Sequence, residues 1–256
     1  MEEIDVLVNE HGVRNLKILD ELFAIKHPRI DQFCDLLEAR GYDLNMWCFA
    51  RTDTVTPEML KRLKKVGVNW IAFGFESADE EILSATNKRA AAEQSPAAIK
   101  MSRDAGMNIC ADVIVGLWED DEHSITRTRD FLHEHQFEWV NIYPAFAYPG
   151  TPLYDRYIQE GFIQEPERWD GYGIYSYDCE PLPTKHLSAA RVLQLRDEIF
   201  DGYFKDPVIL DMLAKRFGAA TRRHVEEMTQ IRLKRRLFSA EPELTPLSAE
   251  PRRTRA

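Results

Sequence analysis

Four short motifs in this sequence carry groups that can bind a charged or hydroxyl-bearing ligand. Each follows a short apolar run and precedes a helical pattern: Asp20-Glu21, Arg51, Glu76-Ser77 and Gly116. Carboxylates can bind a cation or accept hydrogen bonds from ribose hydroxyls, and a guanidinium can fork onto a carboxylate. Because all strand ends of a parallel barrel open on one face, the four motifs could line a single pocket although they lie far apart in the sequence.

The first two motifs also have ordinary structural explanations. Asp20 and Glu21 could be an acidic pair at a helix N-terminus, where the helix dipole favours negative charge. Arg51 could form a structural salt bridge with Asp53 or Asp20. Strand alternation places the following residues on one face: Asn45, Trp47, Phe49 and Arg51.

The other two motifs end strongly apolar runs. Glu76 follows such a run directly after Gly74-Phe75, so we interpret this carboxylate as a ligand-binding group rather than as mere surface. Ser77 could be a second binding group or could only cap the helix that begins near Asp79. Gly116 could let a ligand approach the backbone or could simply terminate its strand.

The elements that must position these motifs alternate between strand and helix. Apolar runs predict five strands, at residues 15–20, 44–51, 69–75, 108–115 and 138–145. Helical periodicity, starting prolines and terminating glycines predict helices at 2–10, 28–40, 56–65, 79–85, 95–106, 122–135, 151–161, 188–204 and 207–218, with a final basic helix to about 238. Because parallel neighbours need crossover connections of this length, the pattern predicts an α/β fold built as a partial (β/α) parallel barrel.

Domain boundaries follow from changes in character along the chain. We expect a partial barrel core at 1–161, missing its first strand because a helix opens the series of strand and helix units. An aromatic loop and a C-terminal helical extension should occupy 162–238, and a loop of this length without sustained period is more often functional than connecting. Residues 239–256, rich in Pro, Glu, Ser and Arg, should be a disordered tail.

Composition narrows the function classes. A net charge of -10 offers no basic surface for a phosphate backbone, and no apolar run approaches the ~20 residues that span a bilayer. We therefore expect a cytoplasmic protein without nucleic-acid or membrane partners. The cysteines are too scattered for a disulfide framework or a local metal loop, and buried reduced thiols are expected: Cys34, Cys48, Cys110 and Cys179.

Taken in order, the segments 19–23, 50–55, 74–77 and 115–119 resemble the core of radical S-adenosylmethionine (SAM) enzymes, most closely the branch with an upstream cobalamin-binding domain. The resemblance covers roughly residues 2–238. It implies that Asp20 or Glu21 receives the methionyl ammonium of SAM, that Glu76 accepts from the ribose, and that the strand ending at Gly116 lies against adenine. Asp112 departs from the family pattern, in which a small residue is usual at this position.

The resembled family also holds a [4Fe-4S] cluster on a Cys-x-x-x-Cys-x-x-Cys loop, and this branch uses cobalamin. No such cysteine triplet occurs in the sequence, so we expect neither group to be bound by this chain alone. We interpret the chain as the C-terminal part of a methyltransferase-like radical SAM enzyme whose cluster and cobalamin segment lies upstream or on a separate partner. The alternative is a degenerate, non-catalytic barrel that serves as a nucleoside-binding or protein-interaction module. The pattern identifies no catalytic residue, no metal ligand and no small-molecule substrate.

Overall fold

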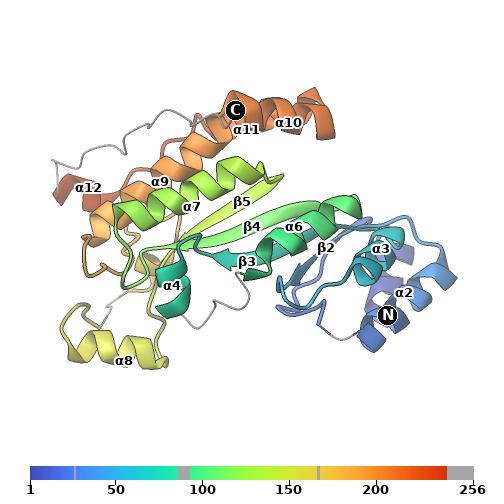
Figure 1. The fold of residues 1–256 in the computed structure, drawn as a ribbon, viewed down its shortest axis with the longest axis horizontal. Helices are drawn as coiled ribbons and strands as arrows, with labels where there is room; N and C mark the ends of the chain where they lie inside the picture. Colours follow the sequence, from blue (N-terminus) through green and yellow to red (C-terminus); the bar gives the residue numbers. More distant parts are fainter. Residues whose placement is uncertain (26, 86–92, 166–167, 241–256) are drawn as a thin grey trace. The chain divides into compact units, whose positions relative to one another are not determined.

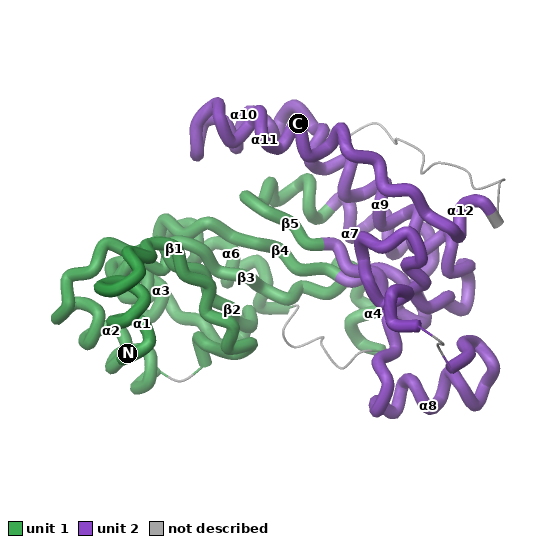
Figure 2. Tube along the Cα trace, turned by 180° about the vertical axis from the view of Figure 1, so that it is seen from behind, with its two compact units in different colours: residues 1–113, 131–141 green, residues 114–130, 142–256 purple. Residues whose placement is uncertain are grey.

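The computed structural model describes residues 1–25, 27–85, 93–165 and 168–240 (Figure 1). The chain divides into two compact units (Figure 2). Unit 1 comprises residues 1–113 and 131–141, and unit 2 comprises residues 114–130 and 142–256. Most of the tail expected to be disordered, from residue 241 onward, lies outside the described residues.

Five strands form one sheet in sequence order: β1 (Asn15–Lys17), β2 (Asn45–Ala50), β3 (Val68–Glu76), β4 (Asn108–Val115) and β5 (Trp139–Pro144). The pairs β1–β2, β2–β3 and β3–β4 are parallel. Strands in sequence order with helical connections make a partial (β/α) barrel, so the predicted fold class is confirmed. β1 is shorter than predicted: the Ile18 amide still donates to the Trp47 carbonyl at 2.8 Å, and the chain then turns away.

The unit 1 part of the sheet buries one side and leaves the other partly accessible. On β2, Met46, Cys48 and Ala50 are buried, whereas the alternating Trp47 and Phe49 are only partly buried. The strand register aligns Lys17, Trp47 and Trp70, and it aligns Gly74 with Asp112, on the partly accessible side, where Ala72 and Cys110 between them are nevertheless buried. We call the accessible side the open face and define it by these residues: Lys17, Trp47, Phe49, Trp70, Gly74, Asp112 and Asn141.

Helices of unit 1 cover the buried side of its strands. α2 (His27–Arg40), α3 (Pro57–Lys65) and α6 (Ser95–Asp104) pack as consecutive neighbours, and α3 contacts β3 (Figure 1). α3 starts as predicted, because the Thr56 side chain accepts from the Met59 amide at 3.3 Å and Pro57 occupies the first turn. A bidentate ion pair between Arg40 and Asp5 links α1 (Glu2–Asn9) to α2. α4 (Glu80–Ala85) is a short helix that follows β3.

Unit 2 is mainly helical. α7 (Glu122–His135) begins in it, and its further elements are α8 (Pro152–Gln159), a 3-10 turn (Asp170–Tyr172), α9 (Ala189–Lys205), α10 (Pro207–Phe217), α11 (Ala219–Met228) and α12 (Arg236–Ala240). The prediction of one final helix to about 238 is wrong, because the chain is non-helical between α11 and α12. There, Arg235 is fully buried and donates to Asp197 and to the carbonyls of Ile174 and Ser176. These tertiary hydrogen bonds outweigh helix propensity at that point.

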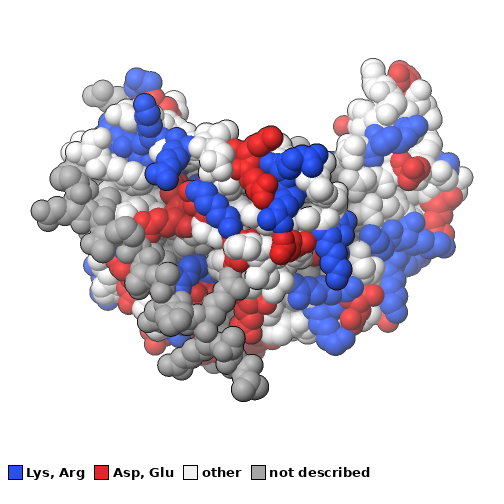
Figure 3. Space-filling model, turned by 90° about the horizontal axis from the view of Figure 1, so that it is seen from above, with Lys and Arg blue, Asp and Glu red and all other residues white. Residues whose placement is uncertain are grey.

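Basic and acidic side chains are interspersed over the surface drawn in Figure 3. In the described part of the chain, many charged side chains are paired within a helix or between neighbouring helices, such as Lys100 with Asp104 and Arg62 with Asp35. Such exposed pairs contribute about 0–1 kcal/mol each, so they shape the surface more than they stabilise the fold. Among the helices that the structure describes, none is long and apolar enough to cross a bilayer.

Candidate functional site

Asp20 lies in the loop between β1 and α2, where it is bound by a neighbouring arginine. Arg29 Nη2 donates to Asp20 Oδ2 at 2.5 Å, and this hydrogen bond holds the pKa of the Asp20 carboxyl below its ordinary value. The loop runs on for several residues before α2 starts at His27, so Asp20 and Glu21 are not first-turn residues of that helix. Glu21 is exposed and has no hydrogen bond or ion pair with any described residue, so of the two carboxylates it is the one open to a ligand.

Arg51 follows the last residue of β2 and forms the structural salt bridge that the sequence left open. Its Nε and Nη2 donate to Asp53 Oδ1 and Oδ2 at 2.8 and 2.6 Å. This bidentate pair raises the pKa of Arg51 above its ordinary value. Half of the Arg51 side chain is exposed, so the pair is a surface interaction worth about 0–1 kcal/mol that a competing carboxylate could replace.

Glu76, the last residue of β3, has a strained backbone. Its φ is 64°, and the Ser77 amide donates to the Phe75 carbonyl at 2.8 Å across it, the hydrogen bond of a three-residue γ-turn. The register with β4 shifts between Gly74 and Glu76, as at a β-bulge. The side chain folds back over Gly74, because a Cβ built there would lie 3.0 Å from Glu76 Oε1.

Ser77 is buried, and its hydroxyl accepts from the Asp79 amide at 3.1 Å. The cap of α4 is Asp79 itself, whose Oδ1 accepts from the amides of Glu81 and Ile82 at 2.9 and 3.2 Å. Ser77 therefore stabilises the turn that precedes the helix, which corrects the reading of Ser77 as the cap.

Gly116 belongs to unit 2 and is required there by its surroundings. Its φ is +87°, and a Cβ at this position would lie 2.5 Å from Val192 Cγ1 on α9. The amides of Gly116 and Leu117 both donate to Asp120 Oδ2 at 3.0 Å, and Asp120 is in turn held by the Ser124 hydroxyl at 2.6 Å. A purely structural role explains this glycine fully.

The open face of unit 1 brings together a cation and a row of aromatic rings. The indoles of Trp47 and Trp70 stack with centroids 5.1 Å apart and an interplanar angle of 10°. The Lys17 ammonium lies 5.2 Å from the Trp47 ring centroid and 5.1 Å from that of Phe49. Cation–π contacts of this kind hold the ammonium in place at an exposed site.

Asp112 occupies the same face beside β5. Its Oδ1 accepts from Asn141 Nδ2 at 2.7 Å and from the Cys110 thiol at 3.5 Å. Burial raises the pKa of Asp112, and the charge of Glu76 raises it further, whereas the two hydrogen bonds and the charge of Lys17 oppose the rise. Lys17 and Glu76 therefore both lie close enough to Asp112 to affect its ionisation.

Sequence reasoning did not select Lys17, Asp112 or Asn141 as site residues. The available signal was the strand alternation that placed Trp47 and Phe49 on the same face as Arg51, because extending it to the neighbouring strands includes all three. Asp20 and Arg51 do follow β1 and β2, and Glu76 ends β3, three neighbouring parallel strands of unit 1. Their convergence with Gly116 around one cavity remains a prediction, since Gly116 belongs to the other unit.

The four cysteines do not form a ligand set. All four are free and buried, as expected. Burial raises the pKa of Cys34 and Cys179 to about 11 and that of Cys48 to about 12, and it raises that of Cys110 well above its ordinary value. In the described part of the chain no three His, Cys, Asp or Glu side chains gather in a way that could hold a metal ion. The described residues therefore do not offer a ligand set for a [4Fe-4S] cluster.

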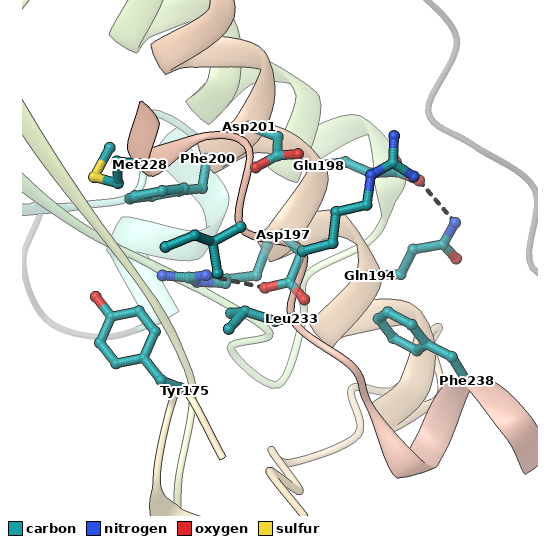
Figure 4. Close-up of a pocket in the computed structure, with 12 residues that line it drawn as sticks. Tyr175, Gln194, Asp197, Glu198, Phe200, Asp201, Met228, Leu233 and Phe238 are labelled. Carbon is teal, nitrogen blue, oxygen red and sulfur yellow. Dashed lines mark hydrogen bonds and ion pairs between the residues drawn. The ribbon is translucent and has the colours of Figure 1, made fainter. Parts of the chain in front are cut away.

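Unit 2 has a cavity of about 580 Å³ beside α9 (Figure 4). Arg196 borders it, almost fully buried between Tyr175 and Phe200 and bound to Asp197 and the Ile142 carbonyl at 2.9 and 2.8 Å. Arg235 approaches Asp197 with a second, bidentate pair. No residue of the four predicted motifs lines this cavity.

Comparison with known proteins identifies the family of this chain. A sequence model described as the Radical SAM superfamily matches residues 1–132, more than half of the chain. The chain belongs to the radical SAM superfamily. The resemblance inferred from the strand-end motifs is therefore confirmed at the level of the family.

Two curated relatives of this radical SAM protein cover most of it. An uncharacterized methyltransferase of Pyrococcus horikoshii is 23% identical over 82% of the chain and 45% of the relative. The anaerobic magnesium-protoporphyrin IX monomethyl ester cyclase of Cereibacter sphaeroides is 30% identical over 79% of the chain and 32% of the relative. The chain thus spans less than half the length of either relative.

Solved structures share the fold of this radical SAM chain at low sequence identity. The apo form of OxsB, a cobalamin-dependent S-adenosylmethionine radical enzyme, superposes with a TM-score of 0.59 at 14% identity and covers 90% of the chain and 40% of OxsB. The radical SAM methyltransferase TsrM of Kitasatospora setae, solved with cobalamin and a [4Fe-4S] cluster bound, gives a TM-score of 0.55 at 13% identity, over 65% of the chain and 32% of TsrM.

Proposed function

We propose that this chain binds S-adenosylmethionine at the carboxyl edge of the unit 1 sheet, as the barrel part of a methyltransferase-like enzyme of the cobalamin-dependent branch. The turn at Glu76 carries the proposal. A non-glycine residue at φ 64° costs of order 1–3 kcal/mol, and such strain is concentrated at functional sites. The turn holds a carboxylate beside the exposed backbone of Gly74, where it can accept from the two hydroxyls of a ribose.

The other proposed contacts to the cofactor depend on which polar side chains already form ion pairs within the protein. Asp20 is bound to Arg29, so Glu21 is the better carboxylate for the methionyl ammonium. Arg51 would exchange Asp53 for the carboxylate of SAM, which is inexpensive at an exposed pair. Ser77 acts through the turn rather than on the ribose. Gly116 belongs to unit 2 and is not part of the site proposed on unit 1.

We propose that the iron-sulfur cluster, and with it the electron for cleavage of SAM, depends on a polypeptide segment outside these 256 residues. This follows from the cysteines, which are separate, buried and protonated rather than gathered as thiolates. The same segment or a separate partner would supply the cobalamin. The role of the chain itself is then to bind and orient SAM and substrate, and we expect no radical chemistry from it alone.

The class of reaction rests on the relatives. Besides the Pyrococcus methyltransferase, they include two bacteriochlorophyllide d methyltransferases of Chlorobaculum tepidum, both 27% identical to this chain. Methyl transfer is therefore the reaction that we propose for the complete enzyme. A degenerate barrel that acts only as a nucleoside-binding or interaction module is the second candidate, and the dispersed cysteines are the observation that favours it.

Calorimetric titration of the chain with SAM tests the proposal. Wild type should bind, and Glu76→Ala should weaken binding at least tenfold, whereas Glu80→Ala, an exposed glutamate in the first turn of α4, should bind like wild type. Equal binding by Glu76→Ala would refute the ribose contact. No heat from wild type would favour an interaction module over a SAM-binding barrel.

A further inference from the structure

The cavity beside α9 is bordered by a guanidinium that is almost fully buried. The Arg196 side chain is only 2% exposed, and its Cζ lies 5.6 and 4.9 Å from the ring centroids of Tyr175 and Phe200. Its Nε and Nη1 donate to the Ile142 carbonyl and to Asp197, and no described residue accepts from Nη2. Because buried donors are normally paired, solvent or a ligand has to supply the acceptor for this nitrogen.

The buried charge at this wall is unbalanced. Arg196 and Arg235, two buried guanidinium groups, share the single carboxylate of Asp197. The other donor of Arg235 binds the backbone carbonyls of Ile174 and Ser176, which carry no charge. We call Arg196, Asp197 and Arg235 the arginine cluster, and none of the three has a further ion pair with a described residue. A net positive charge in a buried position is costly unless an anion compensates it.

Two further carboxylates border the cavity, and neither forms an ion pair with Arg196. Asp201 is paired with Lys205, whose ammonium lies 2.6 Å from Asp201 Oδ2. Glu198 accepts from Gln194 Nε2 at 2.7 Å, the contact dashed in Figure 4 at the end of the cavity away from Phe200. An anionic ligand is therefore attracted to the Arg196 end and repelled from the Glu198 end.

The rest of the wall is mainly apolar and comes from three segments of unit 2. It is formed by Tyr175 of the aromatic loop, Phe200 of α9, and Met228, Ile231, Leu233 and Phe238 at and after the end of α11. Figure 4 shows Phe200 and Met228 at one end and Phe238 at the other, with Leu233 between them. Tyr175 and Ile231 are 64% and 70% exposed, so a ligand would cover apolar surface that now faces water. A volume of about 580 Å³ is typical of a site for a small organic molecule.

We propose that this cavity binds an organic carboxylate with an aromatic body, a second small molecule besides SAM. The carboxylate accepts from Arg196 Nη2 and balances the charge of the arginine cluster. The body extends along α9 over Leu233 towards Phe238, where the rings of the wall offer edge and face contacts. The inference does not depend on the proposed SAM site, because the described lining residues all belong to unit 2.

Naphthylacetate and naphthylacetamide are the probes, because they share a two-ring body and differ in the charge of the polar end. Calorimetric titration of the 256-residue chain should show saturable binding of naphthylacetate. The amide should bind about tenfold more weakly, because it cannot balance the arginine cluster. Equal affinity for the two probes, or no saturable binding of the acid, would overturn the inference.

Arg196→Lys tests the charged end of the site. It keeps a positive charge near Tyr175 and Phe200 but lacks the planar fork that presents Nη2. It should lower the affinity for naphthylacetate about tenfold and leave that for the amide unchanged. Arg223→Lys, at an exposed arginine of α11 outside the cavity, should bind both probes like wild type. An unchanged preference for the acid in Arg196→Lys would reject the assigned contact.

Phe238→Ala tests the apolar end without touching the arginine cluster. It should weaken both probes several-fold, whereas Leu237→Ala, a partly buried neighbour on α12 that does not line the cavity, should weaken neither. Circular dichroism melting confirms that each variant is folded before affinities are compared. If Arg196→Lys does not fold, the preference of wild type for the acid and the loss in Phe238→Ala still decide the question. Unchanged affinity of Phe238→Ala for both probes would place the binding elsewhere and reject the cavity as the site.

Discussion

Replacement of Gly116 by alanine should destabilise unit 2 through two separate effects. The backbone at Gly116 has φ +87°, which an L-residue adopts only at a cost of about 1–2 kcal/mol. The added methyl group would lie 2.5 Å from Val192 Cγ1, far inside van der Waals contact. Val192 is fully buried on α9 and β-branched, so it cannot simply rotate away.

The steric part should cost about 1–3 kcal/mol, the usual range for forcing an extra methylene-sized group into a packed interior. Together with the backbone term, Gly116→Ala should lower the free energy of unfolding by about 2–5 kcal/mol. That is a large share of the stability of an ordinary domain. Truncating the neighbour in Gly116→Ala/Val192→Ala should recover the steric part, giving a coupling energy of about 1–3 kcal/mol in a double-mutant cycle.

Two other glycines of unit 2 supply matched controls in urea denaturation followed by circular dichroism. Gly161 has φ +76° and open space around its missing Cβ, so Gly161→Ala should show the backbone cost of about 1–2 kcal/mol alone. Gly202 lies within α9 with ordinary φ and open space, so Gly202→Ala should stabilise by about 0.5–1 kcal/mol. Equal losses for Gly116→Ala and Gly161→Ala, or no coupling with Val192→Ala, would refute the claim that α9 packs against this backbone.

Three further predictions concern buried polar groups. Arg235→Met should cost about 3–5 kcal/mol in urea denaturation, because it removes the bidentate partner of Asp197, which keeps only Arg196, and the donor to the Ile174 and Ser176 carbonyls. Arg236→Met next to it, whose ion pairs are exposed, should cost under about 1 kcal/mol, and equal losses would contradict this reasoning. Burial raises the pKa of Cys48 to about 12 and raises the pKa of the other three thiols as well. Iodoacetamide at pH 8 should therefore label the native protein far more slowly than the urea-unfolded protein, and rapid labelling of a native thiol would count against the buried environment. Burial raises the folded-state pKa of Asp112, so the contribution of this carboxyl to stability is fully present below the ordinary Asp pKa of about 3.9 and is lost as the pH rises through the folded pKa. Asp112→Asn should abolish this pH dependence and should be at least as stable as wild type at pH 7. A clear loss of stability at pH 7 would show instead that the folded protein favours the charged form.

Much of the fold could be read from local signals in the sequence. All five strands and the starts of several helices were predicted, because strand alternation, side-chain caps and starting prolines act over a few residues. Thr56 and Ser188, the first residues of the helices predicted at 56–65 and 188–204, cap them with side chains that accept from the Met59 and Arg191 amides. The predicted face of β2, with Trp47 and Phe49 away from the core, is also a local property of a pleated strand.

The candidate site was only partly predictable, since side-chain partners depend on neighbours that alternation does not specify. Asp20 and Arg51 were placed after the correct strands, but their binding to Arg29 and Asp53 is a choice among several nearby charges. Asp112 was noticed as a departure from the family pattern, whereas its contact with Asn141 joins two strands separated by α7. The break before α12 likewise depends on Arg235 finding Asp197 on a different helix.

The sequence by itself therefore determined the order of strands and helices, the side of each strand that faces the core, and the positions where polar groups follow strands. Tertiary structure alone decided which of those groups remain free to bind a ligand. The physical reason is range. Caps, turns and alternation are governed by backbone geometry and hydrogen bonds within a few residues, whereas the contact of Lys17 with Trp47 and the hydrogen bond from Asn141 to Asp112 depend on how separate strands come to lie side by side.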